Sequence, residues 1–472
     1  SIILIMIIEY MSISTIDLAT HKQVFNVNIN NKKTFGEVTT DFSLINKILD
    51  LLPQYLFENP SLKWLDPCAG KGYFSMVLYK RLFKSLQIKI KCPSKRHQHI
   101  IQNMIWMVEI NSEHIPFLYD VFGTEANIVQ HDFLEMHEMK FDIIIANPPF
   151  NSKGSIKVPT NKKSQKKKDG VSIWRDFVKT AIYNLNNNGY LAMITPSIWM
   201  KSDQELLKLL QKWKIHKIRC MTNTQTNRVF HMQAQTPTCY FTFQKTPTLT
   251  LNYDIFIYDE QKEKYISFNN SAYIDTRFSL PLFAPSIIKK LITYVRKAGN
   301  IKVIKTSMRP DYKGLTVSKI LDGNHSYPNI TTCILNKLEP EIIINFSNRK
   351  CIYSGIPKLV LAHKMYGFPF IDTNGLYGIS NRDNYVILNK TDIEFNKLKQ
   401  FLSTKLALVV YKATRYRMRY LEKYAFDFLP DITKLKDFPE EITDETVADY
   451  FNFDEMERKC IESITKKQYG TF

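Results

Sequence analysis

The chain has 472 residues, enough for two or three domains, and its 44% hydrophobic and 23% charged residues are typical of a soluble globular protein. Lysine and arginine (64) outnumber aspartate and glutamate (45), which gives a net charge of +19. This charge favours a polyanionic partner, with nucleic acid ahead of an anionic membrane surface. A proteome that is rich in lysine would give the same excess. The seven cysteines are scattered, without CxxC spacing or a Cys/His cluster, which argues against a zinc site and structural disulfides and indicates an intracellular protein.

The N-terminal segment begins with an apolar run of eight residues, SIILIMII. This run is too short to cross a bilayer, and it lacks the positive residues and the cleavage site of a signal peptide. We therefore expect an N-terminal extension over residues 1–22, no membrane segment, and a location in the cytoplasm of a bacterium or of a viral host.

Residues 61–245 alternate segments of strand and helix character. We predict helices over 74–86, 172–185 and 203–213, the second of which is followed by the stop signal NNNGY. This alternation predicts a mostly parallel α/β sheet with helices on both faces. The strands are predicted at 62–70, 103–110, 126–132, 141–150, 190–197 and 239–245.

Acidic residues end the first three of these strands. LDPCAGKGYF places Asp66 at a strand end, with Gly70 and Gly72 in the loop before a helix, where glycines let backbone amides approach a ligand. Glu109 ends the next strand, either to accept from ribose hydroxyls or as a merely solvated acid. Asp132 ends the third and can accept from an adenine amino group, whose ring the following phenylalanine can cover. Together the three strand ends predict a nucleoside-binding cleft.

The fourth strand, FDIIIANPPF, ends in an amide, two prolines and an aromatic ring. Its isoleucines form the apolar run of a strand that is covered on both faces. Pro148 and Pro149 must end the strand, because they fix φ and remove two backbone donors in succession. Asn147 and Phe150 are thereby held at the carboxyl end of a strand, where open α/β sheets bind ligands.

DPCAGKGYF, VEIN, QHDF and NPPF resemble motifs I to IV of the S-adenosylmethionine-dependent amino-methyltransferases that act on adenine in DNA. GEVTTDFSLINKILDLLP, GYLAMITPSIWM and NRVFHMQAQTPTCYFTF are similar to further motifs of that family, so the resemblance covers about residues 34–245. The spare length follows the catalytic half, as in the gamma class. The resemblance implies a Rossmann-like class I methyltransferase domain over 23–245 and a mixed α+β target recognition domain over 246–472.

The resemblance also implies S-adenosylmethionine as the cofactor, no metal, and catalysis by the NPPF motif. The Asn147 side-chain oxygen and the Pro148 carbonyl would accept the two N–H groups of the adenine, Pro149 would stiffen the turn, and Phe150 would stack on the flipped-out base. Phe230 is either a second stacking wall or a core aromatic. The cofactor-binding residues implied are Thr40, Asp66, Pro67, Ala69, Gly70, Gly72, Glu109, Ile110, Asp132, Phe133 and Asn147.

Three positions depart from the family pattern. Thr40 is followed by Asp41 where the family usually has proline, and Lys71 stands between the two motif I glycines where small residues are common. Thr40 is nevertheless expected to contact the methionyl carboxylate. Phe150 replaces a tyrosine, which keeps the stacking ring and loses only a hydroxyl.

Basic residues outside the motifs are candidates for DNA contacts. The lysine-rich segment 151–170 is either a disordered insertion or a segment that binds phosphates beside the flipped base. Segments 367–387 and 412–420 fit base-edge and phosphate contacts, although such Arg/Tyr runs also pack around surface helices. The predicted DNA-binding residues are Lys162, Lys163, Lys166, Lys167, Lys168, Asn381, Arg382, Arg415, Arg417 and Arg419.

The sequence therefore predicts a site-specific methyltransferase that modifies the N6 amino group of a flipped-out adenine in double-stranded DNA. We expect a monomer or homodimer, with a cognate restriction endonuclease as a candidate partner. Two alternatives stay open: methylation of RNA or of a protein glutamine side chain, and a DNA-binding specificity module that has lost catalysis. A fused nuclease is not expected, because no PD…ExK-type carboxylate cluster is present.

Overall fold

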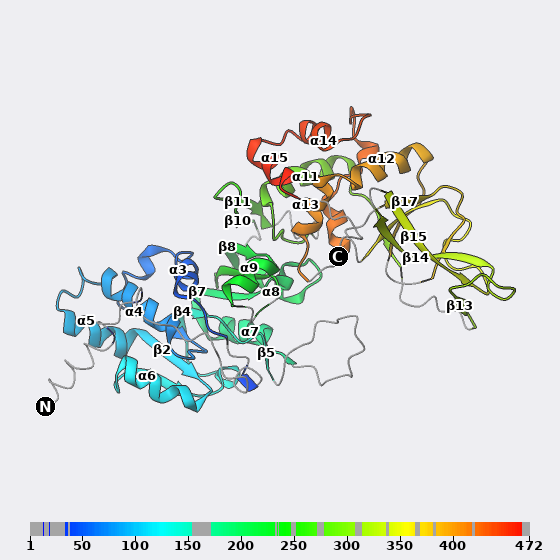
Figure 1. Cartoon of the computed structure of the whole chain (residues 1–472). Coiled ribbons are helices and arrows are strands. Elements are labelled where there is room, and N and C mark those ends of the chain that lie inside the picture. Colours follow the sequence, from blue (N-terminus) through cyan, green and yellow to red (C-terminus); the bar gives the residue numbers. More distant parts are fainter. Residues whose placement is uncertain are drawn as a thin grey trace. The chain divides into compact units, whose positions relative to one another are not determined.

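The computed structural model describes residues 13, 18, 34–35, 38–152, 171–231, 234, 236–246, 252–270, 278–306, 314–336, 339–363, 369–380, 384–417 and 421–464. The chain divides into two compact units (Figure 1). The N-terminal unit comprises residues 1–199, 203–256 and 269–272, and the C-terminal unit comprises residues 200–202, 257–268 and 273–472. The roles predicted for residues 1–22, 23–245 and 246–472 stay predictions.

The N-terminal unit is built on a sheet with β1 (Trp64–Asp66) near its centre. On one side β1 is followed by β2 (Ile105–Glu109) and β3 (Asn127–Gln130), and on the other by β4 (Phe141–Ala146) and β7 (Leu185–Pro196), all parallel. β9 (Thr238–Gln244) lies antiparallel between β7 and β8 (Lys214–Met221). The order β3-β2-β1-β4-β7-β9-β8 with one reversed strand is that of the class I methyltransferase sheet, so the predicted fold is confirmed.

Helices cover both faces of this sheet. Successive side chains of a strand point to opposite faces, and every residue of β1 and the three isoleucines of β4 are buried, so neither face is open to water. The helices of the N-terminal unit are α3 (Phe42–Leu49), α4 (Tyr73–Ser85), α5 (Pro93–His99), α6 (Ile115–Phe122), α7 (Trp174–Asn184), α8 (Glu205–Gln211) and α9 (Asn223–Val229).

Helix α7 ends just before the NNNGY segment, in line with the predicted stop, but the whole segment belongs to the following strand. α7 ends at Asn184 and β7 begins at Leu185. Within the strand Asn188 has a φ of 64°, and the pairing of β7 with β4 shifts register here. A Cβ on Gly189 would lie 2.8 Å from the carbonyl oxygen of Asp142, so only glycine fits this close approach. The stop signal therefore produces an irregularity inside β7 instead of a separate turn.

The C-terminal unit is mixed α+β, as expected. Ile330, Cys333, Val360, Ala362, Ile379 and Val386 form a buried core cluster to which strands of both its four-stranded sheets contribute. One sheet has the order β12-β19-β16-β17 and the other β13-β15-β14-β18. Their strands are β12 (Ile304–Lys305), β13 (Val317–Ser318), β14 (Tyr327–Asn336), β15 (Glu339–Ser347), β16 (Lys358–Ala362), β17 (Pro369–Asp372), β18 (Gly378–Ile379) and β19 (Asn384–Ile387).

The C-terminal unit also contains parts of the strands β10 (Asp254–Asp259) and β11 (Lys264–Asn269). Its helices within the described residues include α11 (Pro285–Ala298), α12 (Asp392–Leu402), α13 (Lys405–Ala413), α14 (Asp444–Tyr450) and α15 (Glu455–Glu462). A buried carboxylate, Glu457, accepts hydrogen bonds from Lys262 and Lys290 and so ties α15 to α11. Of the helices in the described ranges, none combines the length and the apolar character that crossing a membrane requires.

Candidate active site

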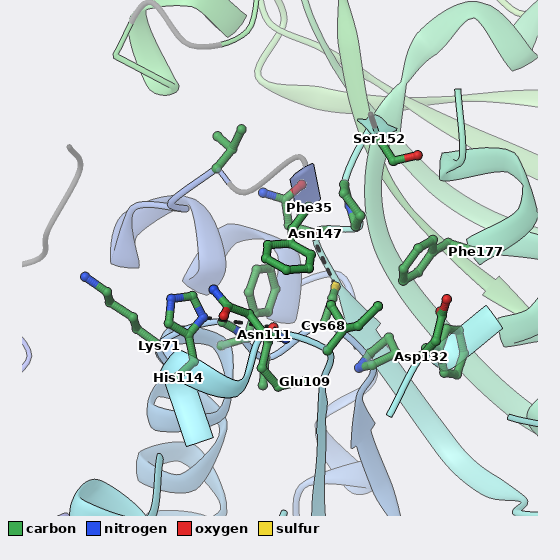
Figure 2. A pocket seen from close by; sticks show the side chains of 18 of the residues that line it. Phe35, Cys68, Lys71, Glu109, Asn111, His114, Asp132, Asn147, Ser152 and Phe177 are labelled. Carbon is green, nitrogen blue, oxygen red and sulfur yellow. Dashed lines mark hydrogen bonds and ion pairs between the residues drawn. The ribbon is translucent and has the colours of Figure 1, made fainter. Parts of the chain in front are cut away.

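A cavity of 410 Å³ opens in the N-terminal unit where β1, β2, β3 and β4 end (Figure 2). Carboxyl ends of parallel strands meet at one edge of a sheet, so the four motifs that are distant in sequence converge there. The N-terminal segment and α7 supply the remaining walls. The lining residues are Thr34, Phe35, Val38, Thr39, Thr40, Pro67, Cys68, Ala69, Gly70, Lys71, Tyr73, Phe74, Glu109, Ile110, Asn111, His114, His131, Asp132, Phe133, Leu134, Asn147, Pro149, Ser152, Ile173 and Phe177.

The loop after β1 is shaped by its glycines and by Asp66. Gly72 has a φ of 76°, and a Cβ there would lie 2.7 Å from the ring of Phe122. Asp66 is buried beneath the loop and is not among the lining residues. Its carboxylate accepts from the Ser75 hydroxyl at 3.1 Å and from the Cys68 amide at 3.4 Å, and burial raises its pKa to about 7. Asp66 therefore joins the strand end to helix α4.

Glu109 fastens the same loop from the end of β2. Its Oε2 accepts from the Gly70 amide at 2.6 Å, and its Oε1 accepts from the Asn111 amide at 2.7 Å. Burial raises the pKa of this carboxyl, while hydrogen bonds from the backbone amides of Asn111, Gly70 and Ile110 oppose the rise. A carboxylate has about four lone-pair sites, so Glu109 can still accept from a hydroxyl in the cavity.

The end of β3 supplies an acid and a ring. Asp132 accepts from the Leu134 amide at 2.9 Å and so starts a short 3₁₀ turn, which leaves its second oxygen to the cavity wall. Phe133 is 2% exposed and packs against Phe177 of α7, with ring centroids 5.6 Å apart. Ile110, which is 45% exposed, lines the opening. Apolar and acceptor groups thus stand together, as a purine ring with an amino group would require.

The fourth motif is held at both its side chain and its backbone. Asn147 Nδ2 donates to Thr40 Oγ1 at 2.7 Å, and the thiol of Cys68 donates to the Asn147 carbonyl at 3.4 Å. Because an amide has one donating end and one accepting end, the bond to Thr40 assigns Nδ2 to that side and leaves Oδ1 as the end that can accept. The predicted contact of Thr40 with a carboxylate stays untested, and the structure adds this contact with Asn147.

The residues after Asn147 continue the wall. Pro148 is buried, Pro149 lines the cavity and Phe150 is half-buried. The Phe150 carbonyl accepts from the Ile173 amide at 3.2 Å, and β5 (Asn151–Ser152) pairs with β6 (Val171–Ser172). A two-stranded ribbon therefore bounds the lysine-rich segment, whose five predicted lysines, Lys162, Lys163, Lys166, Lys167 and Lys168, lie outside the described residues.

The other predicted site residues are not all brought to the cavity. Phe230 is 1% exposed and caps the C-terminal end of α9, so its ring is not presented for stacking and the core-aromatic alternative fits better. Arg415 is half-buried and Arg417 is exposed, both in the C-terminal unit. Asn381, Arg382 and Arg419 lie outside the described residues.

Several lining residues were missed by the sequence analysis. Cys68 and Asn111 lie inside the motifs DPCAG and VEIN, but their side chains were not assigned a role (Figure 2). His114 and Phe177 lie in the helical elements that follow the second and fourth motifs. The sequence could have indicated them only through their spacing along those helices. In the described parts of the chain, no group of three His, Cys, Asp or Glu side chains is arranged to hold a metal ion.

The sequence is similar to those of known methylases. Residues 22–230 match the family described as Eco57I restriction-modification methylase. The chain is 24% identical over 269 residues to an "Uncharacterized adenine-specific methylase" of Mycoplasma pneumoniae, covering 40% of this chain and 61% of that protein. It is 25% identical over 218 residues to a "tRNA1(Val) (adenine(37)-N6)-methyltransferase" of Haemophilus influenzae, covering 44% of this chain and 82% of that protein. It is 29% identical over 169 residues to the "Type II methyltransferase M.VspI" of a Vibrio species, covering 34% of this chain and 35% of that protein. The chain thus spans less than two thirds of the length of the first and third of these relatives.

Proposed function

From the match of residues 22–230 to the Eco57I restriction-modification methylase family, we infer that this protein methylates the N6 amino group of adenine in double-stranded DNA. The observation that carries the proposal is the Asn147 amide, fixed by Thr40 at the end of β4 within a nucleoside-sized cavity. The family match supports a methylase. The adenine, the DNA substrate and the flipped-out base are our proposals.

The cavity fits S-adenosylmethionine. Glu109 retains hydrogen-bond acceptors for hydroxyls, and Asp132 with Phe133 offers an acceptor beside an apolar ring. Bound in this cavity, S-adenosylmethionine would supply an electrophilic methyl group. All the residues named lie at strand ends that the sheet holds rigid, as a reaction that depends on orientation requires.

Asn147 and Pro148 would activate the target by accepting its hydrogens. An adenine amino group is a poor nucleophile, because its lone pair is delocalised into the ring. Acceptance of one N–H by Asn147 Oδ1 and of the other by the Pro148 carbonyl would direct that lone pair toward the methyl group. A neutral amide suffices for this role, because the positive charge develops only as the bond forms, and a fixed acceptor then costs no reorganisation.

DNA is favoured over RNA by the size and charge of the whole chain. The relative that acts on tRNA matches only 44% of this chain while covering 82% of itself, so more than half of this chain has no counterpart in that match. A relative named as a type II methyltransferase matches 34% of this chain. A second unit of some 200 residues in a chain of +19 net charge fits a domain that reads a polyanion. RNA methylation is the second candidate, on the strength of the tRNA relative.

The test is a map of methylated adenines in cells that lack other adenine methylation. Cells expressing the wild-type chain should carry N6-methyladenine at one short recurring DNA sequence, and cells expressing Asn147→Ala should not. Total tRNA from the same cells is digested and analysed in parallel. Modified adenine in tRNA alone would establish the second candidate, and no modification in either nucleic acid would refute both.

A further inference from the structure

Asn111 lines the cavity and carries a buried hydrogen-bond donor. The residue is 4% exposed, it lines the cavity, and its Nδ2 has no hydrogen-bond partner among the described residues. A buried amide nitrogen without a partner destabilises a folded protein, so such groups generally have a partner in the working protein. Figure 2 shows the Asn111 side chain beside those of Glu109 and His114.

The orientation of this amide is fixed by the chain itself. Asn111 Oδ1 accepts from the Glu113 amide at 3.1 Å and starts the short 3₁₀ turn Ser112–His114. An N–H can only be matched by the oxygen end of the amide, so a flipped side chain would lose this bond. The donating end of the Asn111 amide is therefore the end that remains without a partner among the described residues.

The neighbouring group has the opposite polarity. Two residues earlier, Glu109 offers a carboxylate that accepts from the Gly70 and Asn111 amides, has His114 Nδ1 4.0 Å from its Oε1, and keeps lone-pair capacity for a further donor. A hydroxyl is the group that donates to a carboxylate and at the same time accepts from an amide N–H. A carbonyl or a ring nitrogen could satisfy Asn111 but not Glu109.

We propose that Asn111 Nδ2 donates to a ribose hydroxyl of the cofactor, so that Asn111 and Glu109 together read the sugar as both an acceptor and a donor. This hydrogen bond rests on the proposed cofactor. It would make Asn111 a residue that determines specificity for ribose over a deoxy sugar. The bond to Glu113 and the bond to the ligand use opposite ends of one amide, so binding needs no rearrangement of the turn.

Isothermal titration of the full-length protein with S-adenosylhomocysteine and with its 2′-deoxy and 3′-deoxy analogues tests the proposal. Asn111→Ser keeps an N-cap for the turn but removes the amide donor. It should weaken binding of S-adenosylhomocysteine by roughly 3- to 10-fold, the effect of one hydrogen bond, and should weaken binding of at least one deoxy analogue by much less. An equal loss against all three ligands, or no loss, would overturn it.

Asn111→Asp provides the same comparison should the serine variant fail to fold. It keeps both the shape and the cap, and it replaces the donor by an acceptor next to Glu109, so the loss should be larger than for serine. The readout is separate from the proposed function. A wild-type protein that binds S-adenosylhomocysteine but methylates no DNA leaves the inference standing, while a wild-type protein that does not bind it removes both.

Discussion

Thr40 can have one of two roles: to orient the Asn147 amide, which it contacts, or to contact the methionyl carboxylate of the cofactor. Thr40→Val has nearly the same shape but cannot accept from Asn147 Nδ2, so the amide loses its fixed orientation. We expect turnover to fall by about 3- to 10-fold, the effect of one hydrogen bond, while the dissociation constant of S-adenosylmethionine changes little. Thr40→Ser should restore turnover. Weaker cofactor binding with normal turnover would assign Thr40 to the methionyl carboxylate instead.

Asn147 itself should show the larger effect. Asn147→Ala removes the proposed acceptor for the amino hydrogens, and the expected loss in single-turnover methyl transfer is on the order of a hundredfold or more. Calorimetric binding of S-adenosylhomocysteine should stay within about threefold of wild type, since a charge-developing transition state is affected more than the ground state. Near-native turnover in a folded variant would disprove the role of the NPPF motif.

The buried carboxyl of Asp66 makes stability depend on pH. Its pKa is raised from 3.8 to about 7, so at a pH between these values the folded protein holds a proton that the unfolded chain has released. The free energy of unfolding therefore falls as pH rises through this window, by at most about 1.4 kcal/mol per pH unit from this group. Above the window this group adds no further change with pH. Asp66→Asn stays neutral, so its unfolding free energy in urea should rise relative to wild type from pH 4 to pH 7. A constant difference would exclude a raised pKa.

At the scale of single residues, the sequence located the acceptors at the strand ends of the cavity wall but not the donors within it. Glu109, Asp132 and Asn147 could be predicted because acids and amides at strand ends stand out against apolar strands. Asn111 and Cys68 could not be predicted. The role of Asn111 depends on a donor that has no partner among the described residues of the folded chain, and the role of Cys68 depends on its contact with the Asn147 carbonyl. A pattern of strands and helices does not contain this information.

At the scale of the secondary-structure elements, the start of α4 depends on one glycine more than on the other. Gly72 combines a φ of 76° with a Cβ position only 2.7 Å from Phe122, whereas Gly70 has a φ of 53° and nothing within 4 Å of its Cβ position. Gly72→Ala should therefore cost about 2–4 kcal/mol of unfolding free energy in a denaturant titration, and Gly70→Ala about 1 kcal/mol. Equal costs would mean that Phe122 moves aside freely.

The element pattern was predictable wherever the core dictated it. The apolar runs of β1, β2, β4 and β7 and the helical spacing of α7 were found because burial on the sheet requires them. The two-residue ribbon of β5 and β6 was not, because two residues carry no period. Asp41, a departure from the family pattern, proves to be the N-cap of α3, accepting from the Ser43 amide at 2.7 Å.

At the scale of the whole molecule, the excess of positive charge should appear as salt-dependent DNA affinity. Replacing Lys162, Lys163, Lys166, Lys167 and Lys168 by glutamine should flatten the log–log salt slope by up to about 0.9 per lost phosphate contact. The matched control removes the same charge from Lys47, Lys84, Lys89, Lys91 and Lys95, which are exposed on the N-terminal unit. An equal change in both variants would show that net charge alone is responsible.

The small ribbon of β5 and β6 also bears on how such a protein can change over evolutionary time. Asn151 pairs with Ser172 and Ser152 with Val171, and the backbone bond between Ile173 and Phe150 continues the pairing toward Asn147. The chain leaves the candidate site through β5 and comes back beside it through β6. We therefore expect that changes in the length or sequence of residues 153–170 leave the geometry of Asn147 unchanged, because the paired strands lie between that segment and Asn147 along the chain. If Asn147 has the proposed role, a lineage with this arrangement can vary the contacts beside it while the chemistry is inherited unchanged.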